Sequence, residues 1–416
     1  MTPVQILSLV SLILTGLISL CMAYQLVYLF VPLFGKHKRL TTQEQKRYAI
    51  LIAARNEEKV LPHLLHSIGL QDYPAHLLHT YVAADNCTDS TAAIAEAAGA
   101  TVFVRNDTKR IGKGYVIHDL LEFIAQRGEL EQYDGFLIFD ADNLLDPSYV
   151  TNMNRTCCAG YEAYCGYRNS KNFGSNWISA GHALWYLHDC EQLNLSRHLL
   201  GLPCSVTGTG FGFTRQLLEK MGGWNFFALT EDIEFSVWCA THGVKIGYCH
   251  NAIVYDEQPV NLRNSFRQRV RWVQGTIQVS CRHFGALIRG LGQGGRLTYA
   301  CVEHMTLTIW GYLICALMGI VGTVLSILNL GLIPTLIITA VMAMGGLLHM
   351  FLTAALLLIF QGKRIHATGW QKIKGLFAFP LYVISFLPIF FMAIFSKFNW
   401  PPIEHSVSIS NEELNV

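Results

Sequence analysis

The chain has 416 residues, of which 51% are hydrophobic and 14% are charged, and its net charge at neutral pH is +2. So much apolar sequence excludes a wholly soluble protein and indicates a membrane region beside a domain of ordinary size. The basic residues gather beside apolar runs, which argues against nucleic acid as a partner, and the twelve cysteines include no CxxC pair, which argues against a zinc ribbon.

Residues 4–34 contain no charged side chain and exceed the roughly 20 residues that cross a bilayer. The basic segment Lys36-His37-Lys38-Arg39 follows the run. No basic segment precedes the run, and no small-residue cleavage site is evident. We therefore predict a retained membrane anchor over residues 1–35 and not a signal peptide that is removed.

The next part of the chain, residues 45–260, alternates short apolar runs with segments of helical spacing. Strands are predicted at residues 48–53, 80–84, 101–105 and 136–139, and the first helix at residues 57–69. This alternation is typical of an α/β fold with a mainly parallel, Rossmann-like sheet, in which ligands bind beyond the carboxyl ends of the strands. We therefore expect site residues where these strands end.

Polar clusters follow three of the predicted strands. They are Arg55-Asn56-Glu57-Glu58, Asp85-Asn86 and Asp140-Ala141-Asp142-Asn143. Two carboxylates as close as Asp140 and Asp142 stay ionised together when they share a cation, and Mg²⁺ or Mn²⁺ commonly joins one or two carboxylates to a substrate phosphate. The pattern predicts a metal site, although a solvated loop or a helix cap would have the same sequence.

Three later segments have the composition of ligand-binding segments. Lys113 stands between two glycines at the start of a predicted helix, where it could contact a phosphate. The Gly-rich segment 205–212 would let the backbone approach a ligand closely. Thr230, Glu231 and Asp232 open another helix, and a capped helix start explains these residues when they are considered alone. Their order along the chain, after the predicted metal site, favours a functional role.

The segment 261–298 is predicted to connect the α/β domain with the membrane. Gln268, Arg271 and Trp272 fall on one face of its helix. The apolar spacing farther along is that of a helix lying in the plane of the lipid headgroups. The remaining arginines are predicted to flank the membrane or to pack inside the protein; they are Arg263, Arg267 and Arg269.

The C-terminal part is predicted to contain three spans over residues 299–396, which makes four transmembrane helices in all. Residues 304–362 contain no Lys, Arg, Asp or Glu and would form two spans with a turn near Gly331. A further apolar block, 376–396, would form the last. The loop 361–374 is basic and the tail 397–416 is acidic. The excess of positive charge on cytoplasmic loops places residues 35–299 in the cytoplasm and both termini outside.

From its anchor to its last span, the chain resembles the membrane-embedded inverting glycosyltransferases of family 2, such as cellulose, hyaluronan and poly-N-acetylglucosamine synthases. The resemblance rests on four motifs in this order: Asp85, Asp140-x-Asp142, Thr230-Glu231-Asp232 and Gln268-x-x-Arg271-Trp272. It implies an α/β glycosyltransferase domain of the GT-A type at residues 45–260, cytoplasmic, in an integral protein of a bacterial cell membrane.

The resemblance also implies roles for single residues. Asp232 would be the general base that takes the proton from the acceptor hydroxyl. The cations at the site would offset charge on the leaving diphosphate. The implied ligands of the nucleotide sugar are Arg55, Glu57, Asp85, Lys113, Asp140 and Arg271; those of the acceptor are Gly208, Thr209, Gly210, Glu231, Gln268 and Trp272; and those of Mg²⁺ or Mn²⁺ are Asp140 and Asp142.

Three functions fit this sequence. The predicted one is processive synthesis and export of a β-linked polysaccharide from a nucleotide sugar, expected to be UDP-linked, with GDP-mannose left open. The second is transfer of one sugar to a membrane lipid such as ceramide, diacylglycerol or polyprenyl phosphate, which the small number of spans favours. The third is a non-catalytic transporter or scaffold, against which the intact acidic motifs argue.

Overall fold

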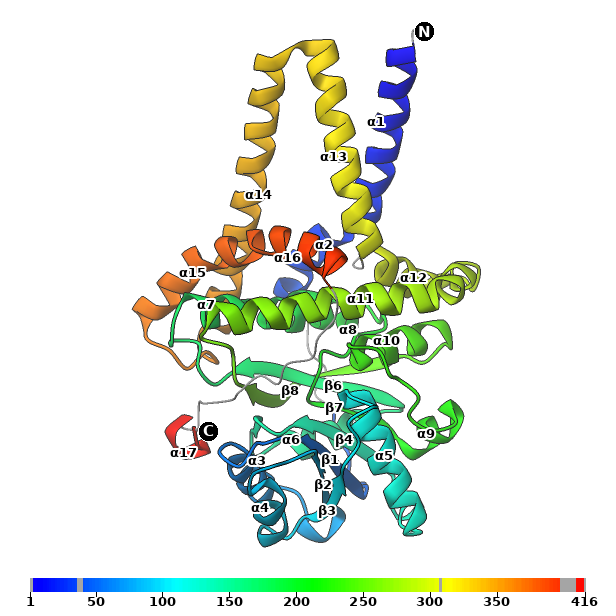
Figure 1. Cartoon of the computed structure of the whole chain (residues 1–416), viewed down its shortest axis with the longest axis vertical. Coiled ribbons are helices and arrows are strands. Elements are labelled where there is room, and N and C mark those ends of the chain that lie inside the picture. The colour runs from blue at the N-terminus through cyan, green and yellow to red at the C-terminus, as the bar shows by residue number, and fades with distance from the viewer. Residues whose placement is uncertain (1–2, 36–39, 307–308, 397–408, 415–416) are drawn as a thin grey trace.

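The computed structural model describes residues 3–35, 40–306, 309–396 and 409–414. It consists of an α/β domain beneath a group of upright helices (Figure 1). The domain is built on an eight-stranded sheet with the order β3-β2-β1-β4-β7-β6-β8-β5. The strands are β1 (Tyr48–Ala54), β2 (Leu78–Asp85), β3 (Thr101–Arg105), β4 (Gly135–Asp140), β5 (Leu144–Leu145), β6 (Ala163–Ser170), β7 (Phe211–Thr214) and β8 (Ile246–Asp256). All run in one direction except β5 and β7, which confirms the predicted α/β fold.

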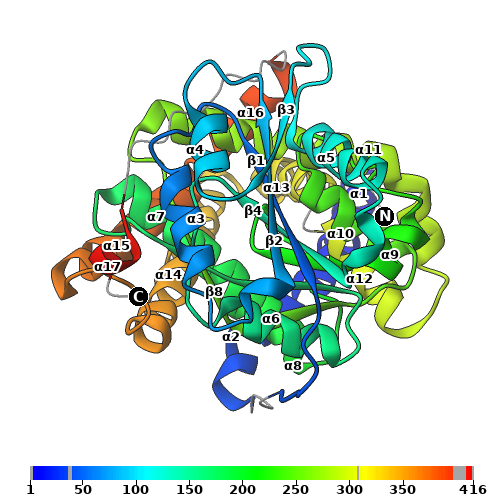
Figure 2. The same ribbon diagram turned by 90° about the horizontal axis from the view of Figure 1, so that it is seen from below.

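The strand β1 lies inside the sheet and is apolar on both faces. Ile50 and Ile52 belong to a core shared with helices α3, α4 and α6, whereas Ala49 and Leu51 belong to a core shared with α5, α7, α9 and α10. A continuous apolar run of this kind is typical of a parallel strand covered by helices on both sides. Figure 2 shows α3 and α4 on one side of β1 and β2, with α5 and α9 on the other. The helix bounds are α3 (Leu61–Gly69), α4 (Thr91–Ala97), α5 (Lys113–Gln126), α6 (Tyr149–Cys158), α7 (Trp177–His188), α8 (Leu195–Leu199), α9 (Arg215–Met221) and α10 (Glu231–Thr241).

The predicted elements agree with the observed ones to within a few residues. The strand at 101–105 matches β3, and the other three predicted strands are extended by one or two residues at their ends. The first helix begins at Leu61 and not at residue 57, because Pro62 lacks a backbone donor and is tolerated only in the first turn. The strands β5, β6 and β7 were not predicted, and the polar end of β6 is buried all the same.

Three helices stand upright on the α/β domain: α1 (Pro3–Met22), α13 (Ile309–Leu330) and α14 (Leu332–Gln361) (Figure 1). By length and composition α14 could cross a membrane, and among the residues whose side chains are described, shorter apolar segments lie in α1 (Gln5–Leu17) and α13 (Leu317–Leu330). Gly331 joins α13 to α14 with a φ of 85°, a conformation that favours glycine. The turn therefore lies where the sequence predicts it. Helix α2 (Tyr24–Phe34) lies at the base of α1.

The last predicted span, residues 376–396, is arranged differently. Its residues form α15 (Gly369–Ile384) and α16 (Phe386–Phe395), which together are long and apolar enough to cross a membrane. They lie across the base of α14 in Figure 1 and do not stand beside it. The helix is interrupted at Ser385 because Pro388 cannot donate a hydrogen bond to the carbonyl of Ile384. Of the segments predicted to span the membrane, those in α1, α13 and α14 stand upright in Figure 1, whereas the last lies across their base.

The described part of the tail, residues 409–414, lies on the sheet. The Asn411 side-chain amide donates a 3.0 Å hydrogen bond to the carbonyl of Leu145. Leu414, in the short helix α17 (Asn411–Leu414), packs against Leu144 and Tyr255. The sequence predicts this tail on the opposite side of the membrane from the sheet. Residues 409–414 contact the sheet in this structure.

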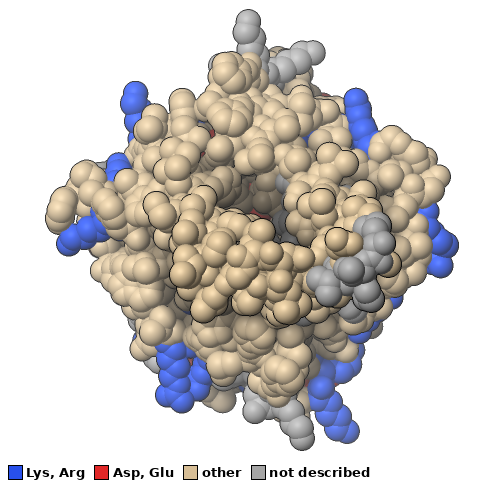
Figure 3. All heavy atoms as spheres, turned by 90° about the horizontal axis from the view of Figure 1, so that it is seen from above, with Lys and Arg blue, Asp and Glu red and all other residues tan. Residues whose placement is uncertain are grey.

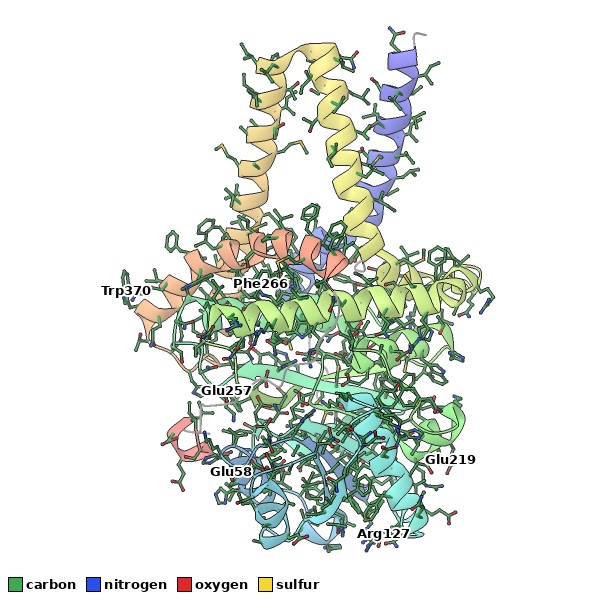
Figure 4. The ribbon with its side chains drawn as sticks, in the orientation of Figure 1. Glu58, Arg127, Glu219, Glu257, Phe266 and Trp370 are labelled. Carbon is green, nitrogen blue, oxygen red and sulfur yellow. The ribbon has the colours of Figure 1, made fainter. Side chains whose placement is uncertain are left out.

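The helix α11 (Leu262–Gly290) lies between the sheet and α16 (Figure 1), followed by α12 (Gly295–Thr306). Arg269 connects α11 to the lying helices: its guanidinium donates to the Tyr382 carbonyl (3.2 Å) and to Ser385 Oγ (2.6 Å) and covers the ring of Tyr382. Arg269 is therefore a packing residue, one of the two roles predicted for it, while Arg263 and Arg267 are exposed. Trp370, on α15, is 65% exposed at the outer end of this layer (Figure 4).

Candidate active site

The carboxyl ends of five parallel strands meet at one edge of the sheet. Because β6 and β8 run in the same direction as β1, β2 and β4, this edge contains residues from both halves of the domain. The residues that end or follow these strands are Arg55, Asp85, Asp140, Lys171 and Asp256. The sequence predicts the first three but not the last two, which follow β6 and end β8.

The loops after β1 and β2 turn sharply. Asn56 and Asn86 have φ values of 58° and 50°, which few residues other than glycine adopt. Asp85 is 6% exposed, and its carboxylate accepts a 2.6 Å hydrogen bond from Arg105. The backbone N–H of Glu57 donates to Thr91 Oγ1. Arg55, Glu57 and Asp85 therefore share the predicted edge, and an ion pair already fixes Asp85 there.

Lys113 connects two of the predicted motifs. It is the first residue of α5, and its ammonium forms an ion pair with Asp140 and donates a 2.9 Å hydrogen bond to the carbonyl of Gly208. The neighbouring Gly114 lets α5 pack closely on the backbone of Phe226, because a Cβ there would lie 1.9 Å from the carbonyl oxygen of Phe226. Lys113, predicted to contact a phosphate, is thus held between the metal motif and the Gly-rich segment.

The segment after β4 is held by internal hydrogen bonds. The Asp140 N–H donates to the Asn143 side chain (3.1 Å) and to Thr209 Oγ1 (3.0 Å). Thr209, predicted to bind acceptor, supports this loop. Asp142 is 4% exposed and accepts a 3.3 Å hydrogen bond from the N–H of Glu257.

Asp140 and Asp142 fit a divalent cation as two hard oxygen donors. The Lys113 ammonium on Asp140 demonstrates that this carboxylate attracts positive charge. Within the described ranges, no three His, Cys, Asp or Glu side chains are grouped as a metal cage. A cation here would therefore complete its coordination with phosphate oxygens and water, as Mg²⁺ commonly does.

Glu231 and Asp232 begin α10, and the hydroxyl of Thr230 makes no capping hydrogen bond to that helix. Burial raises the pKa of Asp232, while the backbone amides of Ile233 and Gly208 and the charge of Lys113 oppose the rise. Burial and the neighbouring charge of Asp232 raise the pKa of Glu231 to about 8. Of the two carboxyl groups, Glu231 is therefore the one expected to keep its proton near neutral pH.

The pKa of Glu231 predicts an effect of alkaline pH on the predicted phosphate contact. As the pH rises through about 8, Glu231 ionises and adds negative charge that acts on Lys113. With Lys113 in its predicted role, UDP or GDP should bind several-fold more weakly at pH 9 than at pH 7, and Glu231→Gln should lack this pH dependence. Calorimetric titration across pH 6–9 measures it. An identical alkaline loss in the variant would contradict the assignment.

A buried ion pair that the sequence analysis missed lies behind the Gly-rich segment. The Arg168 guanidinium on β6 pairs with Asp256 at the end of β8, donates a 2.7 Å hydrogen bond to the Thr207 carbonyl, and stacks on the ring of Tyr186. A Cβ on Gly208 would lie 3.1 Å from Arg168 Nη1 and 4.0 Å from Asp232 Oδ2. The missed signal was Asp256, an acid that ends an apolar run as Asp85 and Asp140 do.

The helix α11 brings its predicted residues to the other side of the site. The indole of Trp272 packs edge to face against His182 and Tyr186, with ring centroids 5.6 and 5.7 Å apart. Tyr186 in turn covers Arg168, and the charge of Arg271 acts on Tyr186. Gln268 and Arg271 are half-buried. The α11 motif and the strand-end residues are therefore connected through Tyr186.

Comparison with known proteins adds an independent finding. Residues 45–275 match the family described as Glycosyltransferase like family 2. The chain is 25% identical over 254 residues to the beta-monoglucosyldiacylglycerol synthase of Synechocystis, covering 57% of this chain and 49% of that one. It is 23% identical over 295 residues to the poly-beta-1,6-N-acetyl-D-glucosamine synthase of Staphylococcus aureus, covering 68% and 67%.

A third relative is the probable glycosyltransferase YdaM of Bacillus subtilis, 24% identical over 262 residues, or 58% of each chain. The matched region thus spans about half to two thirds of these relatives. Among solved structures, the mannosyltransferase PcManGT from Pyrobaculum calidifontis, in complex with GDP-Man and Mn²⁺, aligns with a TM-score of 0.54 at 16% identity, covering 92% of this chain and 99% of that one. At that identity the likeness concerns the fold.

Proposed function

The chain belongs to family 2 of the glycosyltransferases, and from that premise we propose that it transfers one sugar, with inversion, from a nucleotide diphosphate sugar to a hydroxyl group of a membrane lipid. The observation that supports the proposal most directly is the position of Lys113. Burial lowers the pKa of its ammonium, yet the carboxylates of Asp140, Glu231 and Asp232 together raise it. Motifs that lie about 90 residues apart in the sequence are therefore close together around one cation.

Each group has a chemical task in this reaction. Asp232 takes the proton of the acceptor hydroxyl while its oxygen attacks the anomeric carbon, and the bond to the nucleotide diphosphate breaks on the opposite face. Lys113 and Arg271 offset the charge that develops on the leaving diphosphate. Asp140 and Asp142 would hold Mg²⁺ or Mn²⁺, which neutralises the diphosphate when bound. The donor is expected to be UDP-linked.

The arrangement of the helices favours a lipid acceptor over a growing polymer. Only α1, α13 and α14 stand upright in the described part of the chain, and α15 and α16 lie across their base (Figure 1). Few helices are therefore present to surround a polysaccharide. Viewed from the side of the upright helices, the molecule is hollowed near its centre, with acidic atoms at the bottom of the hollow (Figure 3). A lipid headgroup could reach the sheet edge by this route.

Polysaccharide synthesis is the second candidate. The match to a poly-beta-1,6-N-acetyl-D-glucosamine synthase over 295 residues supports it.

The two candidates differ in their products. We propose incubating the purified protein in lipid nanodiscs with Mn²⁺ and radiolabelled UDP-glucose, UDP-N-acetylglucosamine or GDP-mannose. A labelled product that enters the organic phase and carries one added sugar supports lipid transfer. A labelled product of high mass whose length increases with time supports polysaccharide synthesis. Absence of product with every donor would reject both.

The lying helices lead to a prediction about topology. We propose that residues 40–306 are cytoplasmic and that the C-terminus lies on the same side, because Asn411 and Leu414 contact the sheet. A tag placed after Val416 should be accessible from the same side of membrane vesicles as a tag inserted at the exposed turn of Gly128, and a tag before Met1 should be accessible from the other. Protease protection measures this. A C-terminal tag on the side of Met1 would restore the fourth span.

A further inference from the structure

Lys171 is a buried cation beside the predicted metal site. It directly follows β6, and its backbone N–H donates a 2.9 Å hydrogen bond to the carbonyl of Asp256 at the end of β8. Lys171 is 3% exposed, and its Nζ has no hydrogen-bond partner among the residues that the structure describes. An isolated buried ammonium costs several kcal/mol unless neighbouring charge compensates for it.

The compensating charge comes from the carboxylates at the same sheet edge. Asp142 accepts a hydrogen bond from the N–H of Glu257, the residue after Asp256, so Asp142 and Lys171 both contact the backbone at the end of β8. Burial lowers the pKa of Lys171, and the charges of Asp142, Asp256, Glu257 and Glu57 oppose that effect. Asp256 is already paired with Arg168. Asp142 makes the largest of these opposing contributions, ahead of Glu257 and Glu57.

We propose that Lys171 is a built-in counter-cation for Asp142, which weakens the binding of a free divalent cation and makes the site accept that cation together with the donor diphosphate. This inference rests on the proposed function. Because Nζ makes no hydrogen bond to the described residues, Lys171 acts on Asp142 through space, and its charge matters more than its shape. Lys171 therefore tunes the charge around Asp142 and does not ligate the metal.

Each carboxylate of the metal motif is then influenced by one ammonium: Asp140 pairs with Lys113, and Asp142 interacts with the charge of Lys171. A divalent cation arriving alone is repelled by both ammonium groups. A cation that arrives with a diphosphate brings negative oxygens that attract both. At an effective dielectric constant of about 20, a unit charge within several ångströms changes the binding constant of a divalent ion by about tenfold or more.

The test is the affinity for Mn²⁺ alone, measured by electron paramagnetic resonance of free Mn²⁺ in the full-length protein without nucleotide. We expect Lys171→Met, which keeps the length and removes the charge, to bind Mn²⁺ about tenfold more tightly than the unmodified protein. Lys220→Met is the matched control, because Lys220 is exposed and pairs with Glu162 at 3.2 Å, far along the sheet from the motif. Its Mn²⁺ affinity should be unchanged. Circular dichroism confirms that each variant is folded.

A second measurement needs no variant. In the unmodified protein, saturating UDP or GDP should raise the affinity of the protein for Mn²⁺ more than about tenfold, after Mn²⁺ bound by the nucleotide itself is subtracted. Equal Mn²⁺ affinity with and without nucleotide would overturn the inference, as would unchanged or weaker Mn²⁺ binding by folded Lys171→Met. If neither protein bound Mn²⁺, the inference would also be wrong. Normal sugar transfer combined with these negative results would reject the role of Lys171 alone, whereas absence of transfer with every donor would reject the proposed function.

Discussion

Replacing Asp232 by Asn should lower the rate of sugar transfer about a thousandfold while leaving donor binding nearly intact. Asparagine has almost the same shape as aspartate but cannot accept the proton of the acceptor hydroxyl, and loss of a general base typically costs between about a hundred- and ten-thousandfold. The side chain lies close to the Gly208 backbone and within reach of the charge of Lys113. The measurement is the transfer rate at saturating donor, combined with calorimetric titration of UDP or GDP.

Two comparisons decide how that result is interpreted. Glu219→Gln removes an acid on the exposed outer edge of α9, where it pairs with Arg215 one turn away (Figure 4), and should not change the rate. If Asp232→Asn retained more than about a tenth of the rate, the base would have to be another group. Glu231 is the nearest alternative, but with a pKa raised to about 8 by burial and by Asp232 it is protonated near neutral pH and would serve poorly.

The part of the site that could be predicted from the sequence is the part with a local signal. Asp85 and Asp140 each end an apolar run, and a strand that ends on an acid in a parallel sheet places that acid at the ligand edge. Arg168 gives no such signal. It lies in β6, whose last four residues are Tyr167, Arg168, Asn169 and Ser170, and a fully buried strand with this composition resembles a loop in a sequence. Its burial depends on Asp256, 88 residues later.

The apolar composition of the membrane region could be predicted from the sequence, but the direction in which α15 and α16 run could not. Residues 376–396 are apolar enough for a span, and a helix that lies along the base of other helices needs the same composition. What distinguishes the two arrangements is the contact between Arg269 and the backbone of Tyr382, which holds α15 and α16 against α11. A contact across 113 residues has no local sequence signal. The contacts of the tail with Leu144 and Leu145 likewise join residues that are far apart in the sequence.

Replacing Arg168 by Met should destabilise the α/β domain by about 3–5 kcal/mol, the usual cost of leaving one member of a buried ion pair without its partner. Arg168 is 7% exposed and Asp256 is 3% exposed, so solvent cannot replace the lost guanidinium. The loss should also lower the transfer rate, because Arg168 supports the Thr207 carbonyl beside the Gly-rich segment. Chemical unfolding followed by tryptophan fluorescence measures the first effect.

The pH dependence of that loss separates a charge effect from a packing effect. Burial raises the pKa of Asp256 to about 6, although Arg168 opposes the rise. Removing Arg168 should raise the pKa further, so that Asp256 is protonated in the folded variant at pH 5 and is forced to ionise, at a cost in stability, only at higher pH. The difference in unfolding free energy between Arg168→Met and the unmodified protein should therefore be smaller at pH 5 than at pH 8. Adding Asp256→Asn to Arg168→Met should remove most of this pH dependence. A loss that is the same at both pH values would mean that the stacking of Arg168 on Tyr186, and not its charge, holds the two halves of the site together.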